Sequence, residues 1–328
     1  MKRFKYLILL LTTTVFGNFS CHEPIDITVP DTQKKIVLNG LINPDSTVKI
    51  NLSKSISILE NDDKITFLES ATVMLYENDI FKENLQYDTN GYYRCSVYPQ
   101  IGKTYKITAE NSPLDAVDAE TEILPEPIIS SINSQAEFYS EIQTWYNEET
   151  GEHFDTTINI LNRLNIDLTL QDPGNQTNWY FLTFSAIIPQ YEYLPPDYEP
   201  EFSGNKMTSL DYNANNLNWK NYFYSRELNG YVFSDNLFNG SSYTINTDVY
   251  ANAINGNSSS VDTVFVNLHS ITEDFYQYVI SYSKYQDVEG NPLAEPVNIM
   301  SNINNGFGVF SGYSTKTDTV IIDYDTVQ

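Results

Sequence analysis

Short stretches of alternating apolar and polar residues make up most of the chain beyond residue 33. Each stretch is rich in Val, Ile, Thr and Tyr, and turn residues such as Asn90-Gly91 and Ile101-Gly102-Lys103 separate the stretches. A period of two is typical of strands that bury one face. The alternation predicts strands over Lys34–Ile42, Thr47–Ile56, Ser70–Tyr76, Tyr92–Tyr98, Thr104–Glu110 and Ala119–Leu124.

These closely spaced strands predict a mainly β protein that begins with an antiparallel sandwich, immunoglobulin-like or transthyretin-like, over residues 34–125. Pro125-Glu126-Pro127 marks its end, because two prolines two positions apart disrupt both a helix and a central strand. Residues 126–328 are predicted to form a larger β-rich domain, in which Ile128–Ile160 shows no assignable period. Strands are expected there over Arg163–Gln171, Trp179–Ile188, Tyr231–Ser234, Ser242–Asn246, Val261–Leu268, Asn298–Gly312 and Thr319–Ile322.

One segment of the second domain, Ser270–Tyr285, is predicted to be a helix. Ser270 and Glu273 have the spacing of a capping box, and apolar residues recur on one helical face. Gly290 follows as a residue that ends helices. The second domain is therefore expected to contain one helix among its strands.

The beginning of the chain has the pattern of an export signal. Basic residues precede an apolar core over Tyr6–Phe16, which is too short for a stable membrane span. Cys21 follows a small residue and begins an acidic segment, which indicates a bacterial lipoprotein signal with acylation of the Cys21 thiol. We predict a signal peptide over residues 1–20, a lipid anchor at Cys21 and a tether over residues 21–33. An ordinary secretory signal that contains a cysteine is the alternative.

The chain is strongly acidic: it contains 18 Lys and Arg residues and 43 Asp and Glu residues, which give a net charge of −25. Such a surface repels nucleic acid and anionic lipid, so neither is expected as a partner. Apolar residues make up 41% of the chain, which is enough to build packed cores and excludes general disorder. With Cys21 acylated, Cys95 has no disulfide partner, and its place in a predicted strand favours a buried structural thiol.

Recognisable catalytic and metal-binding motifs are absent from the sequence. The three histidines do not have the spacing of a zinc site, and neither a Gly-x-Ser-x-Gly elbow nor a phosphate-binding loop is present. We therefore expect no cofactor and no enzymatic activity. Two alternatives stay open: so many acidic residues always allow a pair of hydrolytic carboxylates, and the loops at Asn61-Asp62-Asp63 and Asp197–Glu201 could supply calcium ligands.

The candidate binding loop is a segment rich in proline and tyrosine, Pro189–Ser203. Tyrosines on a stiff Pro-Pro segment present flat contact surfaces at a small entropic cost, as binding loops do. The candidate binding residues are Tyr191, Tyr193 and Tyr198.

A second recurrent feature is Asp followed by Ser or Thr and then by Thr or Val. The pattern is similar to the O-glycosylation acceptor sequence of Bacteroidota, and modification would place these positions outside the cytoplasm. The candidate acceptors are Ser46, Thr156, Thr263, Thr319 and Thr326.

Several segments occur along the chain in the order expected of one family. They are Lys35–Ile42, Ala71–Val73, Gly102–Tyr105, Leu168–Asn175 with Trp179-Tyr180, Phe233–Gly240, Phe275–Tyr278 and Glu295–Tyr313. With these motifs the chain resembles a family of Bacteroidota cell-surface lipoproteins, the domain of unknown function 4249. The resemblance implies a lipid-anchored protein of the outer membrane that faces the cell surface and is often encoded beside a TonB-dependent receptor. It implies no catalytic residues, because the family has no established activity.

The leading hypothesis from the sequence is a non-enzymatic, lipid-anchored binding or accessory module that acts with such a receptor in nutrient uptake. A surface hydrolase that uses a carboxylate pair and a structural envelope protein are the two alternatives.

Overall fold

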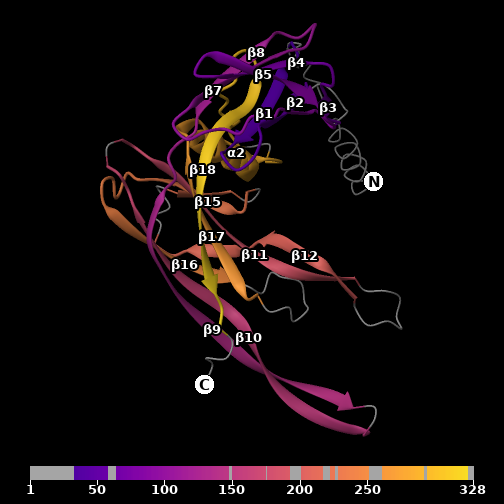
Figure 1. The fold of residues 1–328 in the computed structure, drawn as a ribbon, viewed down its shortest axis with the longest axis vertical. Coiled ribbons are helices and arrows are strands. Elements are labelled where there is room, and N and C mark those ends of the chain that lie inside the picture. Colours follow the sequence, from indigo (N-terminus) through magenta and orange to yellow (C-terminus); the bar gives the residue numbers. More distant parts are fainter. Residues whose placement is uncertain are drawn as a thin grey trace, which may run out of the picture. The chain divides into compact units, whose positions relative to one another are not determined.

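Antiparallel strands dominate the structure, as the sequence predicts (Figure 1). The computed structural model describes residues 33–57, 64–147, 150–174, 176–192, 201–216, 222–225, 228–250, 261–291 and 294–323. Predictions for the signal peptide and for most of the tether lie outside these residues. No helix in the described ranges is long and apolar enough to cross a membrane.

The N-terminal strands form a sandwich with its own core. Its strands are β1 (Ile36–Ile42), β2 (Lys49–Lys54), β3 (Thr66–Phe67), β4 (Thr72–Glu77), β5 (Ile80–Tyr87), β6 (Tyr92–Arg94), β7 (Thr104–Glu110) and β8 (Val117–Glu122). They pair antiparallel in the order β1-β2-β6-β5-β4-β7-β8, with β3 added beside β2. Alternate residues such as Leu38, Leu52 and Ile107 are completely buried, which is the arrangement that the period of two predicts.

Strand β5 was not predicted from the sequence. Its signal is the two-residue turn Asn78-Asp79, in which both residues have positive φ, 48° and 65°, as a tight hairpin with β4 requires. The predicted strand Tyr92–Tyr98 is too long, because β6 ends at Arg94 and Cys95 follows it. Cys95 packs against the sandwich core and is partly buried, and burial raises the pKa of its thiol.

The C-terminal strands form two sheets that enclose a second core. They are β9 (Ile128–Asn147), β10 (Glu152–Gln171), β11 (Trp179–Glu192), β12 (Glu201–Ser209), β13 (Asp211–Ala214), β14 (Tyr222–Ser225), β15 (Gly230–Ser234), β16 (Ser242–Tyr250), β17 (Thr263–Ile271) and β18 (Phe307–Ile321). One sheet has the order β14-β15-β11-β17-β18, with β12 paired to β11, and the other has the order β13-β16-β10-β9. The unassigned segment Ile128–Ile160 is thus the β9–β10 hairpin, and β12 and the end of β11 replace much of the predicted loop Pro189–Ser203.

Strand β11 shows why this first sheet is buried on both faces. Leu182 and Phe184 point into the core shared with the second sheet, whereas Phe181 packs on the opposite face against α2 (Glu273–Val288). A strand with two apolar faces gives a continuous apolar run, which is what Trp179–Leu182 presents.

The helix begins later than the sequence predicts. Its N-cap is Thr272, whose hydroxyl accepts a hydrogen bond from the Phe275 amide, so the predicted cap at Ser270 is wrong. Ser270 stays in β17 because that strand pairs with β11 as far as Ile271. Gly290, with φ +77°, lies just beyond the helix end, as predicted. The predicted strand Asn298–Gly312 is also partly wrong, because pairing in β18 starts at Phe307.

Strand β18 connects the sandwich to the C-terminal sheet. Its first half pairs parallel with β1, from Val37 opposite Phe307 to Ile42 opposite Gly312, and its second half pairs antiparallel with β17. Figure 1 shows it as one long strand shared by both parts. The described residues of Lys34–Ile56 and of Lys64–Gln328 accordingly belong to one compact unit. The domain boundary at residue 125 stays a prediction.

Two glycines in β18 permit this pairing because a side chain would collide with backbone. At Gly308, which has φ +106°, a Cβ atom would lie 2.1 Å from the carbonyl oxygen of Leu38. At Gly312, a Cβ atom would lie 2.1 Å from the carbonyl oxygen of Glu122. Both β1 and the end of β8 therefore approach β18 more closely than any other residue would allow.

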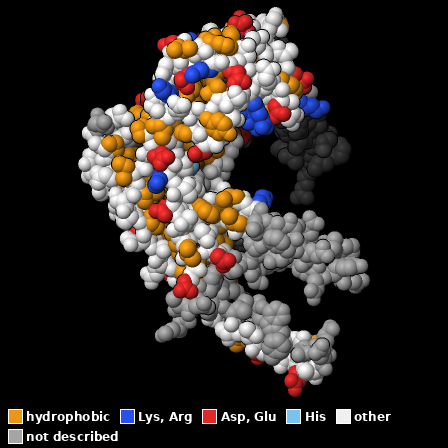
Figure 2. Space-filling view, in the orientation of Figure 1, with side chains coloured by type: hydrophobic (Ala, Val, Ile, Leu, Met, Phe, Trp, Pro, Cys, Tyr) orange, Lys and Arg blue, Asp and Glu red, His pale blue; other side chains and the backbone are white. Residues whose placement is uncertain are grey.

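On the face drawn in Figure 2, the described apolar side chains lie in separate groups among polar ones. Single exposed apolar residues such as Ile80, which is 68% exposed, are ordinary on a protein surface.

Replacing Gly308 by alanine is expected to lower the free energy of unfolding by about 3 kcal/mol or more, through backbone strain and overlap with β1. Gly102→Ala is the matched control, since Gly102 has φ +76° but nothing within 4 Å of an added Cβ, and should cost about 1 kcal/mol. Urea unfolding followed by tryptophan fluorescence measures both. Equal losses in the two variants would show that the close approach to β1 contributes nothing.

Candidate functional site

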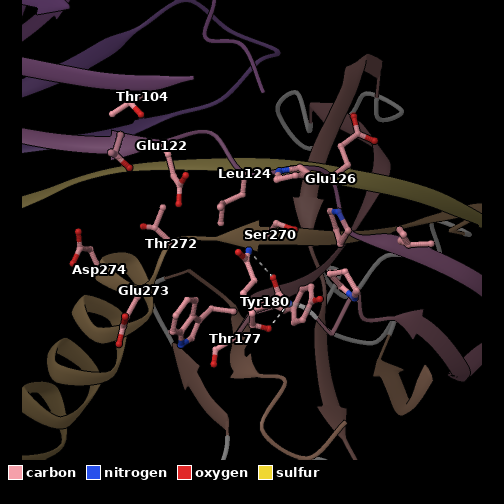
Figure 3. A pocket seen from close by; sticks show the side chains of 18 of the residues that line it. Thr104, Glu122, Leu124, Glu126, Thr177, Tyr180, Ser270, Thr272, Glu273 and Asp274 are labelled. Carbon is pink, nitrogen blue, oxygen red and sulfur yellow. Dashed lines mark hydrogen bonds between the residues drawn. The ribbon is translucent and has the colours of Figure 1, made fainter. Parts of the chain in front are cut away.

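A cleft of about 900 Å³ opens on the described part of the protein. It is bounded by β8, by the Leu124–Ile128 segment, by the start of β11 and by the first turn of α2. Figure 3 shows the side chains of these elements converging on it. Its volume lies in the range of about 300–1,000 Å³ that is usual for ligand sites.

Carboxylates stand on three walls of this cleft. Glu122 comes from β8, Glu126 from the segment that the sequence marked as a domain boundary, and Glu273 from the helix (Figure 3). Glu120 and Asp274 complete the acidic lining, and no basic residue occurs among the described residues that form the cleft. The cleft therefore favours cationic or neutral polar groups over anions.

Strand β18 and the residues around it hold these walls in place. The amide of Gly312 donates to the Thr121 hydroxyl at 2.7 Å, and the hydroxyls of Thr272 and Ser311 lie 2.7 Å apart. The side-chain amide of Asn302 donates to Asp274 at 3.1 Å. The cleft is thus shaped by the same strand that joins the sandwich to the C-terminal sheet.

A buried carboxylate, Asp172, lies behind the floor of the cleft. Its Oδ1 accepts hydrogen bonds from the Tyr180 hydroxyl at 2.7 Å and from the Asn178 side chain at 3.1 Å. Its Oδ2 accepts from the amides of Gly174 at 3.0 Å and Gly240 at 2.8 Å. Four donors compensate the burial of this carboxylate, which is 1% exposed.

This arrangement brings together two motifs that are far apart in the sequence, Leu168–Asn175 and Phe233–Gly240. A Cβ atom on Gly174 would lie 2.3 Å from the Cα of Gly240, so only glycine fits there. Asp235 from the second motif accepts a hydrogen bond from the Asn178 amide at 2.8 Å. The two motifs therefore form one corner that supports Asn178 and Tyr180 in the cleft floor.

Asp172 and Asp235 form a carboxylate pair that bears on the hydrolase alternative. The side-chain amide of Asn178 bridges them, at 3.1 Å from Asp172 and 3.3 Å from Asp235. Burial raises the pKa of Asp235, and the nearby Asp172 carboxylate raises it further, while the Asn178 amide lowers it. Both are almost completely buried and neither lines the cleft, so this pair is placed to stabilise the corner rather than to contact a substrate.

His269 lies next to the cleft residue Ser270 and is enclosed by β11 and β18. Its ring nitrogens lie 2.8 Å from the Thr315 hydroxyl and 3.3 Å from the Thr183 hydroxyl, and its ring stacks on Phe181. Desolvation by burial lowers the pKa of His269 to about 4. The imidazole is therefore a neutral, structural hydrogen-bonding group at physiological pH.

A second candidate surface is the outer part of the β9–β10 hairpin, which we call the distal ribbon (residues 137–147 and 152–161). Strand β16 pairs with β10 only from Arg163 onward, so no third strand among the described residues lies beside the distal ribbon. It nevertheless exposes large apolar side chains: Tyr139 is 46% exposed, Ile142 68% and Tyr146 58%. An isolated two-stranded ribbon is only marginally stable in water, so this surface is suited to contact with a partner.

Of the predicted binding residues, Tyr191 lies at the end of β11 opposite Phe202, and Tyr193 and Tyr198 lie outside the described residues. Cys21 and Thr326 also lie outside them. These positions stay predictions.

Three of the other four candidate acceptors of O-glycans are exposed. Ser46 is exposed in the turn after β1, Thr156 is exposed on the distal ribbon, and Thr319 is exposed on β18. Thr263 is partly buried at the start of β17, and its neighbour Val264 lies opposite Val320, so two of the acceptor motifs are cross-strand neighbours. Their modification stays a prediction.

The described residues contain no group of three or more His, Cys, Asp or Glu side chains that could hold a metal ion. The two loops proposed for calcium lie wholly or largely outside these residues. The cleft itself was missed by sequence reasoning, because its acidic residues come from segments more than a hundred positions apart. The only local signals were the Pro125-Glu126-Pro127 break and the Asp172–Tyr180 motif.

Comparison with known proteins identifies the family. Residues 22–319 match the model of a domain of unknown function, DUF4249. The chain belongs to this family. No curated protein matches the chain. The DUF4249 match spans the sandwich, the cleft and the β1–β18 pairing, so the resemblance inferred from the motifs is confirmed at the level of the family.

Asp172→Asn is expected to lower the free energy of unfolding by about 3 kcal/mol, because both carboxylate oxygens accept from donors and the new NH2 group must face donors in either orientation. Asp235→Asn is the matched control: Oδ1 of Asp235 has no hydrogen-bond partner among the described residues, so an amide nitrogen can occupy that position. Its cost should be about 1 kcal/mol or less. Chemical denaturation of both variants provides the comparison, and a larger loss for Asp235→Asn would contradict the assignment of Asp172 as the centre of the corner.

Replacing His269 by glutamine is expected to remove part of the acid sensitivity of the fold. The pKa of His269 is lowered from 6.5 to about 4 on folding, so the unfolded chain takes up the proton first as the pH falls. Titration of His269 leaves the free energy of unfolding of the wild-type chain unchanged above pH 6.5. It lowers that free energy by about 2–3 kcal/mol as the pH approaches 4. Urea unfolding of the wild-type chain and of His269→Gln, at neutral pH and at a pH midway between 4 and 6.5, measures the effect. The same pH dependence in both proteins would exclude His269 as its source.

Proposed function

We propose that this DUF4249 protein is a lipid-anchored, non-enzymatic binding module at the cell surface that assembles with a TonB-dependent outer-membrane receptor in nutrient uptake. In this proposal Cys21 carries the lipid, and residues 21–33 connect it to the folded part of the chain.

The observation that carries the proposal is the distal ribbon. Tyr139 lies on one face of the ribbon, and Ile142 and Tyr146 lie on the other, so both faces offer apolar contacts. Tyrosine is also favoured in interfaces, because it brings a large rigid contact area at a small entropic cost. A ribbon with two exposed apolar faces is stabilised when a partner protein covers it.

The open cleft supports a binding role as well. Its acidic residues are spread over three walls, and its described lining contains no histidine, cysteine or lysine that could act with them as a nucleophile or base. Such a lining is suited to holding a ligand rather than transforming it. The burial of the Asp172–Asp235 pair also favours binding over hydrolysis.

The test is purification of the full chain from detergent-solubilised membranes of its native host. A TonB-dependent receptor is expected to co-purify with the wild-type chain. Ile142→Glu should reduce the recovered receptor at least about tenfold, because a buried unpaired charge in the interface is costly. Cys21→Ser should move the chain out of the membrane fraction.

Matched variants make the result specific. Ile80 is as exposed as Ile142, at 68%, but lies on the sandwich, so Ile80→Glu should leave receptor recovery unchanged. Cys95→Ser should leave the chain in the membrane fraction. Recovery of a monomer without a receptor, or equal losses for Ile142→Glu and Ile80→Glu, would refute the assembly.

A further inference from the structure

A second hollow, which we call the α2 groove, lies between the sandwich and the helix and has a volume of about 490 Å³. One side comes from β1, β2 and the turn between them, and the other comes from α2 and β18. It is separate from the acidic cleft, since the two share no lining residue. Its lining also differs in kind, because aromatic and amide side chains replace the carboxylates.

Aromatic rings form the helix side of the α2 groove. The rings of Tyr278 and Tyr282, one helical turn apart, are nearly parallel, with an interplanar angle of 9° and centroids 6.0 Å apart. Tyr313 and Phe275 extend the aromatic lining, and Tyr92 adds a ring from the sandwich side. Parallel rings along a helix offer a flat platform whose faces carry partial negative charge.

Polar side chains on the sandwich side complement this platform. Asn39 accepts a hydrogen bond from the Val309 amide, and Asn51 donates one to the carbonyl of Asn90, so both are fixed in position. Asn43 is fixed in the same way, through donation to the Tyr313 hydroxyl at 2.6 Å. Amides and hydroxyls both donate and accept, which is the pairing that sugar hydroxyl groups require.

The charge of the α2 groove is opposite to that of the protein as a whole. Lys49 is the one charged residue among its described lining residues, in a chain whose net charge is −25. Its ammonium group lies 3.7 Å from the centre of the Tyr92 ring, which fixes it at the groove wall. A described lining that has no carboxylate and keeps one fixed cation is complementary to a ligand that carries a carboxylate.

We infer that the α2 groove binds an acidic saccharide. The C–H faces of its sugar rings pack on Tyr278 and Tyr282, its hydroxyls bond to the amides of the sandwich side, and its carboxylate pairs with Lys49. The inference shares with the proposed function only the premise that the chain binds a ligand. It is tested on the purified chain without a receptor, so that failure of one is distinguishable from failure of the other.

The experiment is calorimetric titration of the full chain with trigalacturonic acid and with its trimethyl ester, in which methyl groups neutralise the three carboxylates. The chain is produced in a host without O-glycosylation, because the candidate acceptor Ser46 lines the groove. The acid is expected to bind at least about tenfold more tightly than the ester, as one charge-assisted hydrogen bond provides.

Three variants locate the binding. Lys49→Met should remove the preference for the acid and leave the affinity for the ester unchanged. Tyr282→Ala should weaken both ligands by about tenfold. Tyr285→Ala is the matched control, because this ring is next to Tyr282 on the helix and lies outside the groove lining, and it should change neither affinity. Thermal unfolding of each variant confirms that it is folded.

Three results would overturn the inference. They are the absence of binding of trigalacturonic acid to the folded wild-type chain, equal affinities for the acid and the ester, and an effect of Tyr285→Ala as large as that of Tyr282→Ala.

Discussion

The parallel pairing of β18 with β1 is the constraint on which the rest of the structure depends. Strand β18 contributes Phe310 to the sandwich core, Val309 to the cluster around α2 and Val320 to the C-terminal core. A single strand that is buried in three places couples the parts that it joins, because none of the cores is complete without it. The glycines at 308 and 312 are the sequence features that allow this approach.

The acidic cleft and the α2 groove both depend on that pairing. The acidic cleft has its walls fixed by Gly312, Ser311 and Asn302, which belong to β18 or to the segment before it. The α2 groove is bounded by Val309 and Tyr313 of the same strand. One strand therefore borders both a carboxylate-rich cleft and a groove whose described lining has no carboxylate.

Local structure was predictable from the sequence wherever a short-range signal determines it. Asn90-Gly91 forms the expected turn, with φ of 49° and 76°, because only these residue types accept positive φ readily. The cap at Thr272 was missed because Ser270 is an equally good capping residue, and pairing with β11 decides between them. The β1–β18 pairing joins residues about 270 positions apart, and the cleft assembles acids from three segments. Neither has a local signature, although the motifs around Asp172 and Gly240 did mark the corner that supports the cleft floor.

The account rests on the claim that β18 makes the sandwich and the C-terminal sheets one cooperative unit. Native-state hydrogen exchange at increasing urea, read by mass spectrometry of peptides from β1, β7 and β17, tests this claim directly. The amides of the three strands are expected to open with the same free energy and the same dependence on urea. Opening of β17 at a lower free energy, while β1 and β7 remain protected, would contradict it.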